Sequence, residues 1–257
     1  MQYIIKIIIS IILVSITAIA ISHEATPDKQ GLTKELESIV FYADEYPPYI
    51  YKEDHKIKGQ GAEFLFEIME KLGIKKKEVR VYFSIWNRAY ELAQKDKFKN
   101  GIVNMGYTPE RAPYFQWVGP IGQLEIATIC KKPLPQSFDH AKIIYGVVKD
   151  DIGEKVLLER KIPLKQIKTY PQFETIDQSE IDCISFAIEP AKFILNKMGY
   201  DFDEKFTIVG DTESRDLYIA LNKSIPKAVA NSMQAVVNEL NTTEITALNE
   251  TRNNRGL

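Results

Sequence analysis

The sequence predicts an α/β fold of two lobes, each a mostly parallel sheet flanked by helices. Short apolar runs typical of buried strands alternate with segments whose apolar residues recur every three or four positions, as on one face of a helix. This alternation occurs in two successive series, and no low-complexity tether separates them. Hydrophobic residues make up 45% of the 257 residues and charged residues 26%, which is a globular composition.

The first series has the order strand, helix, strand, helix, strand. Gly61 opens its first helix, in which Leu65, Ile68 and Leu72 share one face, and Gly73 supplies the expected stop. Ligands bind at the carboxyl ends of the strands in sheets of this kind. Strands are expected at residues 38–43, 79–83 and 101–105, and helices at residues 61–72 and 86–94.

The second series repeats this plan. Its last helix is expected to begin at Pro226, because proline is favoured at the first helical position. Strands are expected at residues 124–130, 143–148, 181–186, 206–209 and 217–221, and helices at residues 153–160, 171–179, 190–198 and 226–240.

The amino terminus has the pattern of a secretory signal peptide. Residues 1–22 contain one cation, Lys6, followed by an apolar run over residues 7–21, and small residues precede His23. The run is shorter than a comfortable membrane span, so cleavage after residue 22 is favoured over an uncleaved anchor. The mature protein is therefore expected in the periplasm.

Composition excludes several classes of partner. The formal charge is −2, from 33 basic and 35 acidic residues, so nothing marks a nucleic-acid or anionic membrane surface. The three histidines lack metal-ligand spacing and no complete phosphate-binding motif occurs, so neither a metal nor a cofactor is expected. Cys130 and Cys183 form either one disulfide or two buried thiols. The expected ligand is a small molecule.

The segment from Thr108 to Arg111 is a candidate anion site. Thr108 is a good N-cap, Pro109 suits the first helical position, and Arg111 would then lie on the first turn beside free backbone N–H groups. Such a turn with a guanidinium suits a carboxylate. The alternative is an exposed arginine in an ordinary capped helix.

Aromatic residues form a second candidate site. Tyr46 and Tyr49 flank the Pro47-Pro48 turn, and Trp86 follows the strand expected at residues 79–83. Rings on loops at strand ends can form the walls of a pocket, although packing in the core or hinge accounts for each of them equally well.

The order of segments resembles the extracellular solute-binding proteins of family 3, the type II periplasmic receptors of polar amino-acid ABC transporters. The residues that carry the resemblance are Asp44-Glu45-Tyr46-Pro47-Pro48-Tyr49, Gly59-Gln60-Gly61-Ala62-Glu63, Trp86, the segment from Asn104 to Arg111, and Phe115-Gln116-Trp117-Val118-Gly119-Pro120. The resemblance implies two lobes around a cleft, with hinge crossings near residues 123–127 and 216–220. Lobe 1 would comprise residues 36–124 and 220–257, and lobe 2 residues 125–219.

The resemblance also implies ligand-binding roles. The arginine matching Arg111 grips the ligand's α-carboxylate and the aromatic matching Tyr46 lies against the ligand, while Asn104 and Gly106 occupy positions that add hydrogen bonds. Trp86, Tyr49 and Ser185 are further expected cleft residues.

Two departures from the family pattern concern specificity. Asp150 and Asp151 stand where the family usually has a Thr or Ser hydroxyl at a helix start, and no acid follows Ser185 where the α-ammonium would be bound. Asp151 or Glu189 could replace that acid, or each could have a structural role at a helix N-terminus. An unmodified α-amino acid ligand is therefore doubtful.

The resemblance predicts a monomeric, non-enzymatic receptor that closes on a small carboxylate-bearing solute, an amino acid or related organic acid, and delivers it to an ABC transporter. One alternative is a cyclohexadienyl-dehydratase-like enzyme on the same scaffold, with Glu189 or Asp151 as the acid. Another is a ligand-sensing module.

Overall fold

The computed structural model describes residues 29–95, 97–134, 141–176 and 178–254. The expected signal peptide, residues 1–22, lies outside the described residues. Among the described residues, no helix is both long and apolar enough to cross a membrane.

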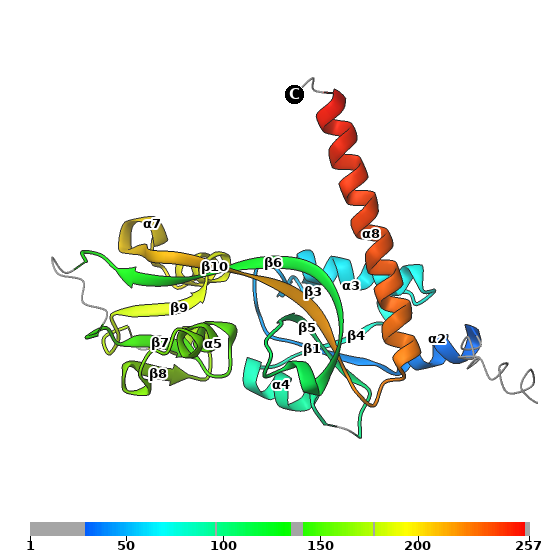
Figure 1. Ribbon diagram of the computed structural model, residues 1–257, viewed down its shortest axis with the longest axis horizontal. Helices are drawn as coiled ribbons and strands as arrows, with labels where there is room; N and C mark the ends of the chain where they lie inside the picture. Colours follow the sequence, from blue (N-terminus) through cyan, green and yellow to red (C-terminus); the bar gives the residue numbers. More distant parts are fainter. Residues whose placement is uncertain (1–28, 96, 135–140, 177, 255–257) are drawn as a thin grey trace, which may run out of the picture.

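Lobe 1 and lobe 2 are two α/β bodies joined by two long strands (Figure 1). Lobe 1 contains α2 (Lys29–Ser38), β1 (Val40–Ala43), β2 (Tyr51–Glu53), β3 (Lys56–Lys58), α3 (Gln60–Lys71), β4 (Arg80–Phe83), α4 (Trp86–Ala93), β5 (Asn100–Gly106) and α8 (Lys227–Asn254). Lobe 2 contains β7 (Tyr145–Val148), α5 (Ile152–Glu159), β8 (Ile167–Tyr170), β9 (Cys183–Ala187), α6 (Ile188–Lys197) and α7 (Phe202–Lys205). The connecting strands are β6 (Phe115–Lys131) and β10 (Phe206–Asn222).

One sheet runs through both lobes. The strand order among the described residues is β4-β1-β5-β10-β6-β9-β7-β8. β1 pairs in parallel with β4 and β5, and β7 pairs in parallel with β8 and β9, as the alternation of strands and helices predicts. β6 and β10 are antiparallel to each other along most of their length and so form a double crossing between the lobes.

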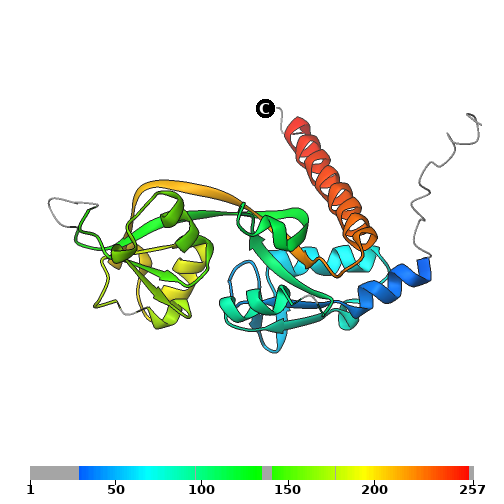
Figure 2. The same cartoon turned by 60° about the horizontal axis from the view of Figure 1, so that its bottom comes forward.

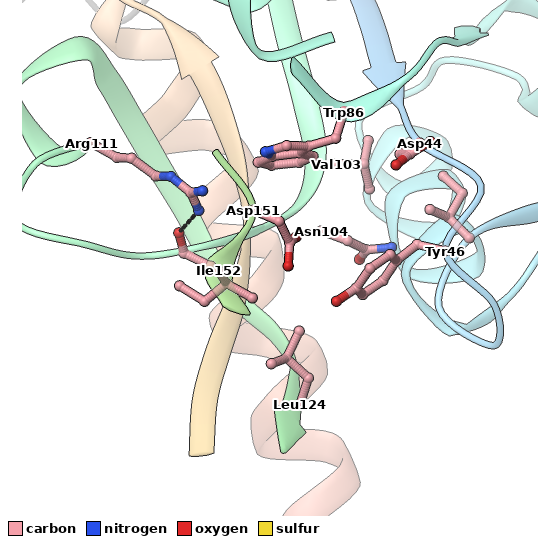
Figure 3. Close-up of a pocket in the computed structure, with 11 residues that line it drawn as sticks. Asp44, Tyr46, Trp86, Val103, Asn104, Arg111, Leu124, Asp151 and Ile152 are labelled. Atoms are coloured by element: carbon pink, nitrogen blue, oxygen red, sulfur yellow. Dashed lines mark hydrogen bonds between the residues drawn. The ribbon is translucent and has the colours of Figure 1, made fainter. Parts of the chain in front are cut away.

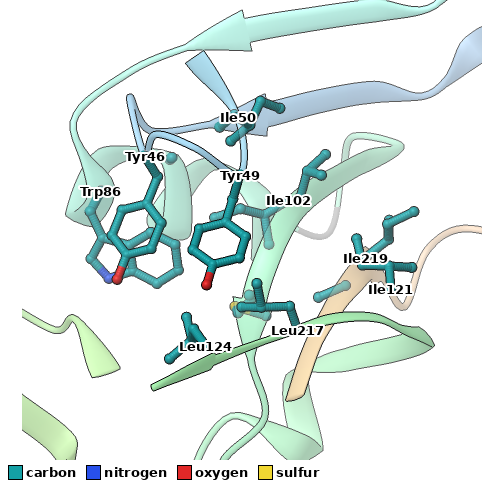
Figure 4. Close-up of a cluster of buried hydrophobic side chains, with 14 of the residues drawn as sticks. Tyr46, Tyr49, Ile50, Trp86, Ile102, Ile121, Leu124, Leu217 and Ile219 are labelled. Atoms are coloured by element: carbon teal, nitrogen blue, oxygen red, sulfur yellow. The ribbon is translucent and has the colours of Figure 1, made fainter. Parts of the chain in front are cut away.

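The core of lobe 1 reaches the hinge. On β1 the side chains of Phe41 and Ala43 are fully buried, and α3 covers the sheet with its apolar face. Leu124 of β6 and Leu217 of β10 join the same cluster beside Tyr49 (Figure 4). The hinge strands therefore contribute side chains to the core of lobe 1.

A disulfide joins β6 and β9 in lobe 2. Cys130 and Cys183 are directly opposed in the antiparallel register, and both are buried in a small cluster with Tyr145 and Leu157. This confirms the disulfide alternative and excludes two buried thiols.

Helix α8 holds the start of a hinge strand. The Gln234 side-chain amide accepts a hydrogen bond from the Gly119 backbone N–H and donates one to the Gly119 carbonyl, each at 2.9 Å. Both views show the far end of α8 extending away from lobe 1 (Figures 1 and 2). The helix is longer than residues 226–240, the range expected from sequence.

The structure corrects three local predictions. Among the described residues of the range 171–179 the one helical segment is a short 3-10 turn, Phe173–Thr175. The Thr175 hydroxyl accepts from the Gln172 backbone N–H and donates to the Gln172 carbonyl, which closes a turn instead of continuing a helix. The strands expected at residues 206–209 and 217–221 are one strand, β10, whose polar middle is paired with β6. No helix begins at Pro109, because residues 109–111 form a turn that is followed by a 3-10 turn, Ala112–Tyr114.

Candidate functional site

A small cavity lies between the lobes beside the hinge (Figure 3). It encloses about 20 Å³, which is room for about one water molecule. Its walls come from the carboxyl ends of β1 and β5, the start of α4, strand β6 and the start of α5. The lining residues are Asp44, Tyr46, Ile50, Trp86, Val103, Asn104, Gly106, Arg111, Leu124, Asp151 and Ile152.

Asn104 and Tyr46 place buried polar atoms at this cavity. Asn104 has a left-handed backbone with φ of 60°, and its amide lies over the start of α3. A Cβ on Gly61 would come within 1.9 Å of the Asn104 Oδ1 atom, so any side chain there would require the Asn104 amide to move. Both Asn104 amide atoms and the Tyr46 hydroxyl are buried without a hydrogen-bond partner. Buried polar groups of this kind normally have one.

Arg111 is almost completely buried, with 1% of its surface exposed. Its Nη1 donates to the Gly106 carbonyl at 3.0 Å and its Nη2 to the Asp150 carbonyl at 2.5 Å, so the second bond joins the two lobes. The guanidinium lies 5.1 Å from the Trp86 ring centre and 5.5 Å from that of Tyr90.

The backbone around Arg111 is a turn, not the expected helix. The Arg111 N–H points to the Thr108 carbonyl at 3.1 Å and to the Thr108 hydroxyl at 3.2 Å, and a 3-10 turn, Ala112–Tyr114, follows. Because the helical bonds stop there, the segment from Thr108 to Arg111 provides no helix N-terminus for an anion. Arg111 is the one cationic side chain among the described residues that line the cavity.

The start of α5 brings lobe 2 to the cavity. Asp151 caps α5, its carboxylate accepting from the Gly153 N–H at 3.0 Å. The Ser185 hydroxyl donates to the Gly153 carbonyl at 2.9 Å, which holds this first turn against β9. The Trp86 indole N–H also donates to the Asp150 carbonyl, at 2.8 Å. Two side chains of lobe 1 therefore bind one carbonyl of lobe 2.

Burial dominates the electrostatics of the two carboxylates. It raises the pKa of Asp44 from 3.8 to about 7, and the negative charges of Asp151, Glu174 and Glu45 add to this, although a hydrogen bond from the Glu45 backbone opposes it. Burial also raises the pKa of Asp151, against the effect of its backbone hydrogen bonds and the Arg111 charge. The cavity is thus a poor environment for two unpaired negative charges.

A sequence model of the bacterial extracellular solute-binding proteins, family 3, matches residues 39–251. The chain belongs to this family.

Solved structures share the fold of this family 3 protein at low sequence identity. A histidine kinase sensor domain similar to periplasmic binding proteins has a TM-score of 0.69 and 16% identity, over 85% of this chain and 96% of that one. A mutant of ArgBP from T. maritima has a TM-score of 0.66 and 15% identity, over 84% and 96%. The arginine-, lysine-, histidine-binding protein ArtJ from Geobacillus stearothermophilus has a TM-score of 0.63 and 16% identity, over 80% and 93%. No curated protein matches in sequence.

The structure of this family 3 protein brings most of the sequence-predicted site residues to one cavity. The residues that line it are Arg111, Tyr46, Asn104, Gly106, Trp86 and Asp151. Tyr49, Ser185 and Glu189 are not among its lining residues. The Tyr49 hydroxyl donates to the Gln123 carbonyl on β6 at 3.1 Å, and Glu189 forms an ion pair with Lys192.

Sequence reasoning missed Asp44 as a site residue. Asp44 directly follows β1 and is the first residue of the motif Asp44-Glu45-Tyr46. Its position at the carboxyl end of a central strand, where ligands bind in sheets of this kind, could have identified it as a candidate. Its proximity to Asp151 and Glu174 was not visible, because those two acids belong to lobe 2. The apolar lining residues Ile50, Val103, Leu124 and Ile152 were also missed, since nothing in their local pattern separates cavity walls from core.

Proposed function

We propose that this protein is an exported receptor that binds a small polar solute between its lobes and delivers it to the membrane components of an ABC transporter. The observation that carries the proposal is the interlobe cavity with unpartnered buried polar atoms on Tyr46 and Asn104. A solute offering donors and acceptors would satisfy them when the lobes close around it. Membership of a solute-binding family supports the same reading.

Binding requires that the lobes first separate. A cavity of about 20 Å³ does not admit an amino acid, so the solute enters an open form and closure follows about β6 and β10. By binding both lobes, the solute shifts the population toward a closed form with more space between the lobes.

Arg111 is the proposed carboxylate anchor. When the lobes separate, the Asp150 carbonyl leaves the Arg111 Nη2, and that N–H becomes available to a ligand. The Arg111 Nε is buried without a partner and offers a second donor. A carboxylate could then replace the carbonyl on the guanidinium.

The test is a thermal-shift screen of polar amino acids, organic acids and small amines, because a ligand of the folded state raises the melting temperature. A hit should also contract the protein in small-angle X-ray scattering, and deletion of the gene should abolish cellular uptake of that solute. If no solute shifts melting or contracts the protein, the receptor proposal is wrong.

A sensing role is the second candidate, favoured by the similarity to a histidine kinase sensor domain. Lobe closure would then be transmitted through α8, which is attached to the hinge at Gly119. In that case deletion would alter a transcriptional response to the solute and leave its uptake unchanged.

We propose no catalytic step; formation of an aromatic product from prephenate or arogenate would contradict this.

A further inference from the structure

We propose that lobe 2 carries a second binding site, outside the interlobe cavity, for a small apolar molecule that ends in a carboxylate. The site is a pocket of about 380 Å³ beside the last turn of α5, which we call the α5 pocket. Among the described residues, it shares no lining residue with the interlobe cavity, so the inference does not depend on the proposed receptor function. The lining residues are Thr128, Tyr145, Leu157, Arg160, Ile162, Val209, Gly210 and Asp211.

The α5 pocket lies between the end of α5 and a bulge in the hinge strand β10. The first turn of α5 borders the interlobe cavity, and the helix ends eight residues later, about 12 Å away along its axis. On β10, Val209 pairs with Thr128 and Glu213 pairs with Ile126, so residues 210–212 stand opposite Ala127 alone. The pocket is therefore built by a helix end and an irregular strand, away from the space between the lobes.

The walls of the α5 pocket combine apolar side chains with two buried hydroxyl groups. Tyr145 and Thr128 are 2% and 6% exposed, and neither side-chain hydroxyl has a hydrogen-bond partner among the described contacts. Buried hydroxyls normally have one. The aliphatic lining residues are Leu157, Ile162 and Val209. A pocket of this size and composition suits a molecule whose hydrocarbon part is buried and whose polar end meets the hydroxyls.

Arg160 supplies the charge that selects a carboxylate. Its Nη2 lies 3.4 Å from the Asp211 carbonyl and 3.5 Å from the Glu213 carboxylate. Both distances exceed the about 2.7–2.9 Å of a strong charge-assisted hydrogen bond, so the guanidinium keeps donor capacity for a ligand. Burial raises the pKa of Tyr145 and the positive charge of Arg160 opposes this, so the guanidinium acts on the phenol across the pocket. A carboxylate there could accept from Arg160 and from both hydroxyls.

The acidic residues near Arg160 do not exclude an anion. Glu213 and the exposed Glu159 both form ion pairs with Arg215, so the charge of Glu213 is not balanced by Arg160 alone. Asp211 is exposed, so water and salt screen its repulsion of a bound anion. A guanidinium and two buried hydroxyl donors therefore outweigh one exposed acid.

The probe for the test is phenylacetate, measured by calorimetry at an ionic strength of about 0.15 M. The matched probes 2-phenylethanol and phenethylamine replace its carboxylate by a neutral and a cationic end. Phenylacetate is expected to bind with a dissociation constant below about 1 mM. The alcohol and the amine should bind at least about five-fold more weakly, because neither accepts a charge-assisted hydrogen bond from Arg160.

Methyl NMR distinguishes the α5 pocket from the interlobe cavity, because aliphatic residues line both. Phenylacetate is expected to shift the methyl signals of Leu157, Ile162 and Val209. The aliphatic residues of the interlobe cavity are Ile50, Val103, Leu124 and Ile152.

Substitutions test the recognition of the carboxylate. Arg160→Gln should weaken phenylacetate binding by about five-fold or more, and Tyr145→Phe by about two-fold or more, because each removes one donor. Arg88→Gln and Tyr82→Phe change exposed residues of lobe 1 and are the matched controls. Both should leave the affinity within about two-fold of the wild type.

Four results would overturn the inference: phenylacetate does not bind, a matched probe binds as tightly, only the methyl signals of the interlobe cavity shift, or Arg160→Gln leaves the affinity unchanged. The receptor function concerns the interlobe cavity and would survive each of them.

Discussion

At the scale of single residues, Arg111 has two roles that the sequence did not separate. It is a candidate ligand anchor, and it is also a buried structural group that binds carbonyls of both lobes. The sequence indicated the chemistry, because a guanidinium after Thr-Pro-Glu is visible in the chain. It did not indicate the burial, because the Asp150 carbonyl and the Trp86 ring come from segments distant in sequence.

Replacing Arg111 with Ala should therefore affect both binding and stability. The Gly106 carbonyl would lose the Arg111 donor and the Asp150 carbonyl would keep only the Trp86 indole N–H, at a cost of about 1–3 kcal/mol in the free energy of unfolding. Affinity for a carboxylate-bearing hit should fall by about ten-fold or more. Urea denaturation and calorimetry measure the two effects. Arg88→Ala, on the outer face of α4, is the control. Unchanged stability and affinity in Arg111→Ala would contradict both roles.

Asp44 should make stability depend on pH. Its pKa in the folded protein is raised from 3.8 to about 7, so the folded state keeps a proton that the unfolded chain releases between about pH 4 and pH 7. The stabilisation of the folded state by protonated Asp44 is complete below about pH 4 and is lost as pH rises to about 7. Asp151, whose pKa is also raised, acts in the same direction.

The measurement is the difference in unfolding free energy between wild type and Asp44→Asn across pH 4–8. The unfolding free energy of Asp44→Asn should increase relative to that of the wild type as pH rises, by on the order of 1 kcal/mol per pH unit at most. The difference between the two proteins should level off above about pH 7. A difference that does not change with pH would show that Asp44 titrates normally.

At the scale of elements, local patterns predicted most strands and helices correctly. The apolar spacing in α3 and the buried runs of β1 and β5 are encoded within each segment, so no distant contact is needed to recognise them. Failures occurred where side chains bond their own backbone. Thr108 and Thr175 both close turns in this way, and a capping residue looks the same in sequence whether a helix or one turn follows.

The joint between α8 and β6 can be tested at Gln234. Replacing Gln234 with Ala leaves the half-buried Gly119 N–H and carbonyl without their partner, so stability should fall by about 1–2 kcal/mol, or several degrees in melting temperature. Ser232→Ala, which removes one hydrogen bond within α8, is the control and should have less effect. Equal effects of the two substitutions would show that the joint contributes nothing specific.

At the scale of the whole molecule, the two-lobed fold was predictable and the closed arrangement was not. The repeated alternation of strands and helices indicated two lobes with a sheet each; the structure has the two lobes, but β6 and β10 join their strands into one continuous sheet. Contacts such as Arg111 with Asp150 depend on how the hinge strands bend, and that has no local pattern in the sequence. The small cavity follows from these contacts.

Lobe 2 should depend on its disulfide. The bond closes a loop between residues 53 apart in sequence, for which chain-entropy estimates give about 4 kcal/mol. The Cys130→Ser, Cys183→Ser double variant should melt at lower temperature, to the same extent as the reduced wild type. Alkylation of the native protein without reductant should modify neither cysteine; modification of both would show that the bond is absent.

The hydrogen bonds from Arg111 and Trp86 to the Asp150 carbonyl, together with the ion pair of Lys155 with Glu110 at 3.0 Å, act as an internal competitor of the solute. A molecule whose lobes are held together by these contacts cannot bind the solute. The apparent association constant therefore equals the intrinsic association constant multiplied by the fraction of molecules with separated lobes. If about one molecule in ten were open, binding would be about ten-fold weaker than the contacts alone would give. Loosening the lobe-to-lobe contacts outside the cavity, as in Glu110→Gln, would then tighten binding without adding a single contact to the solute.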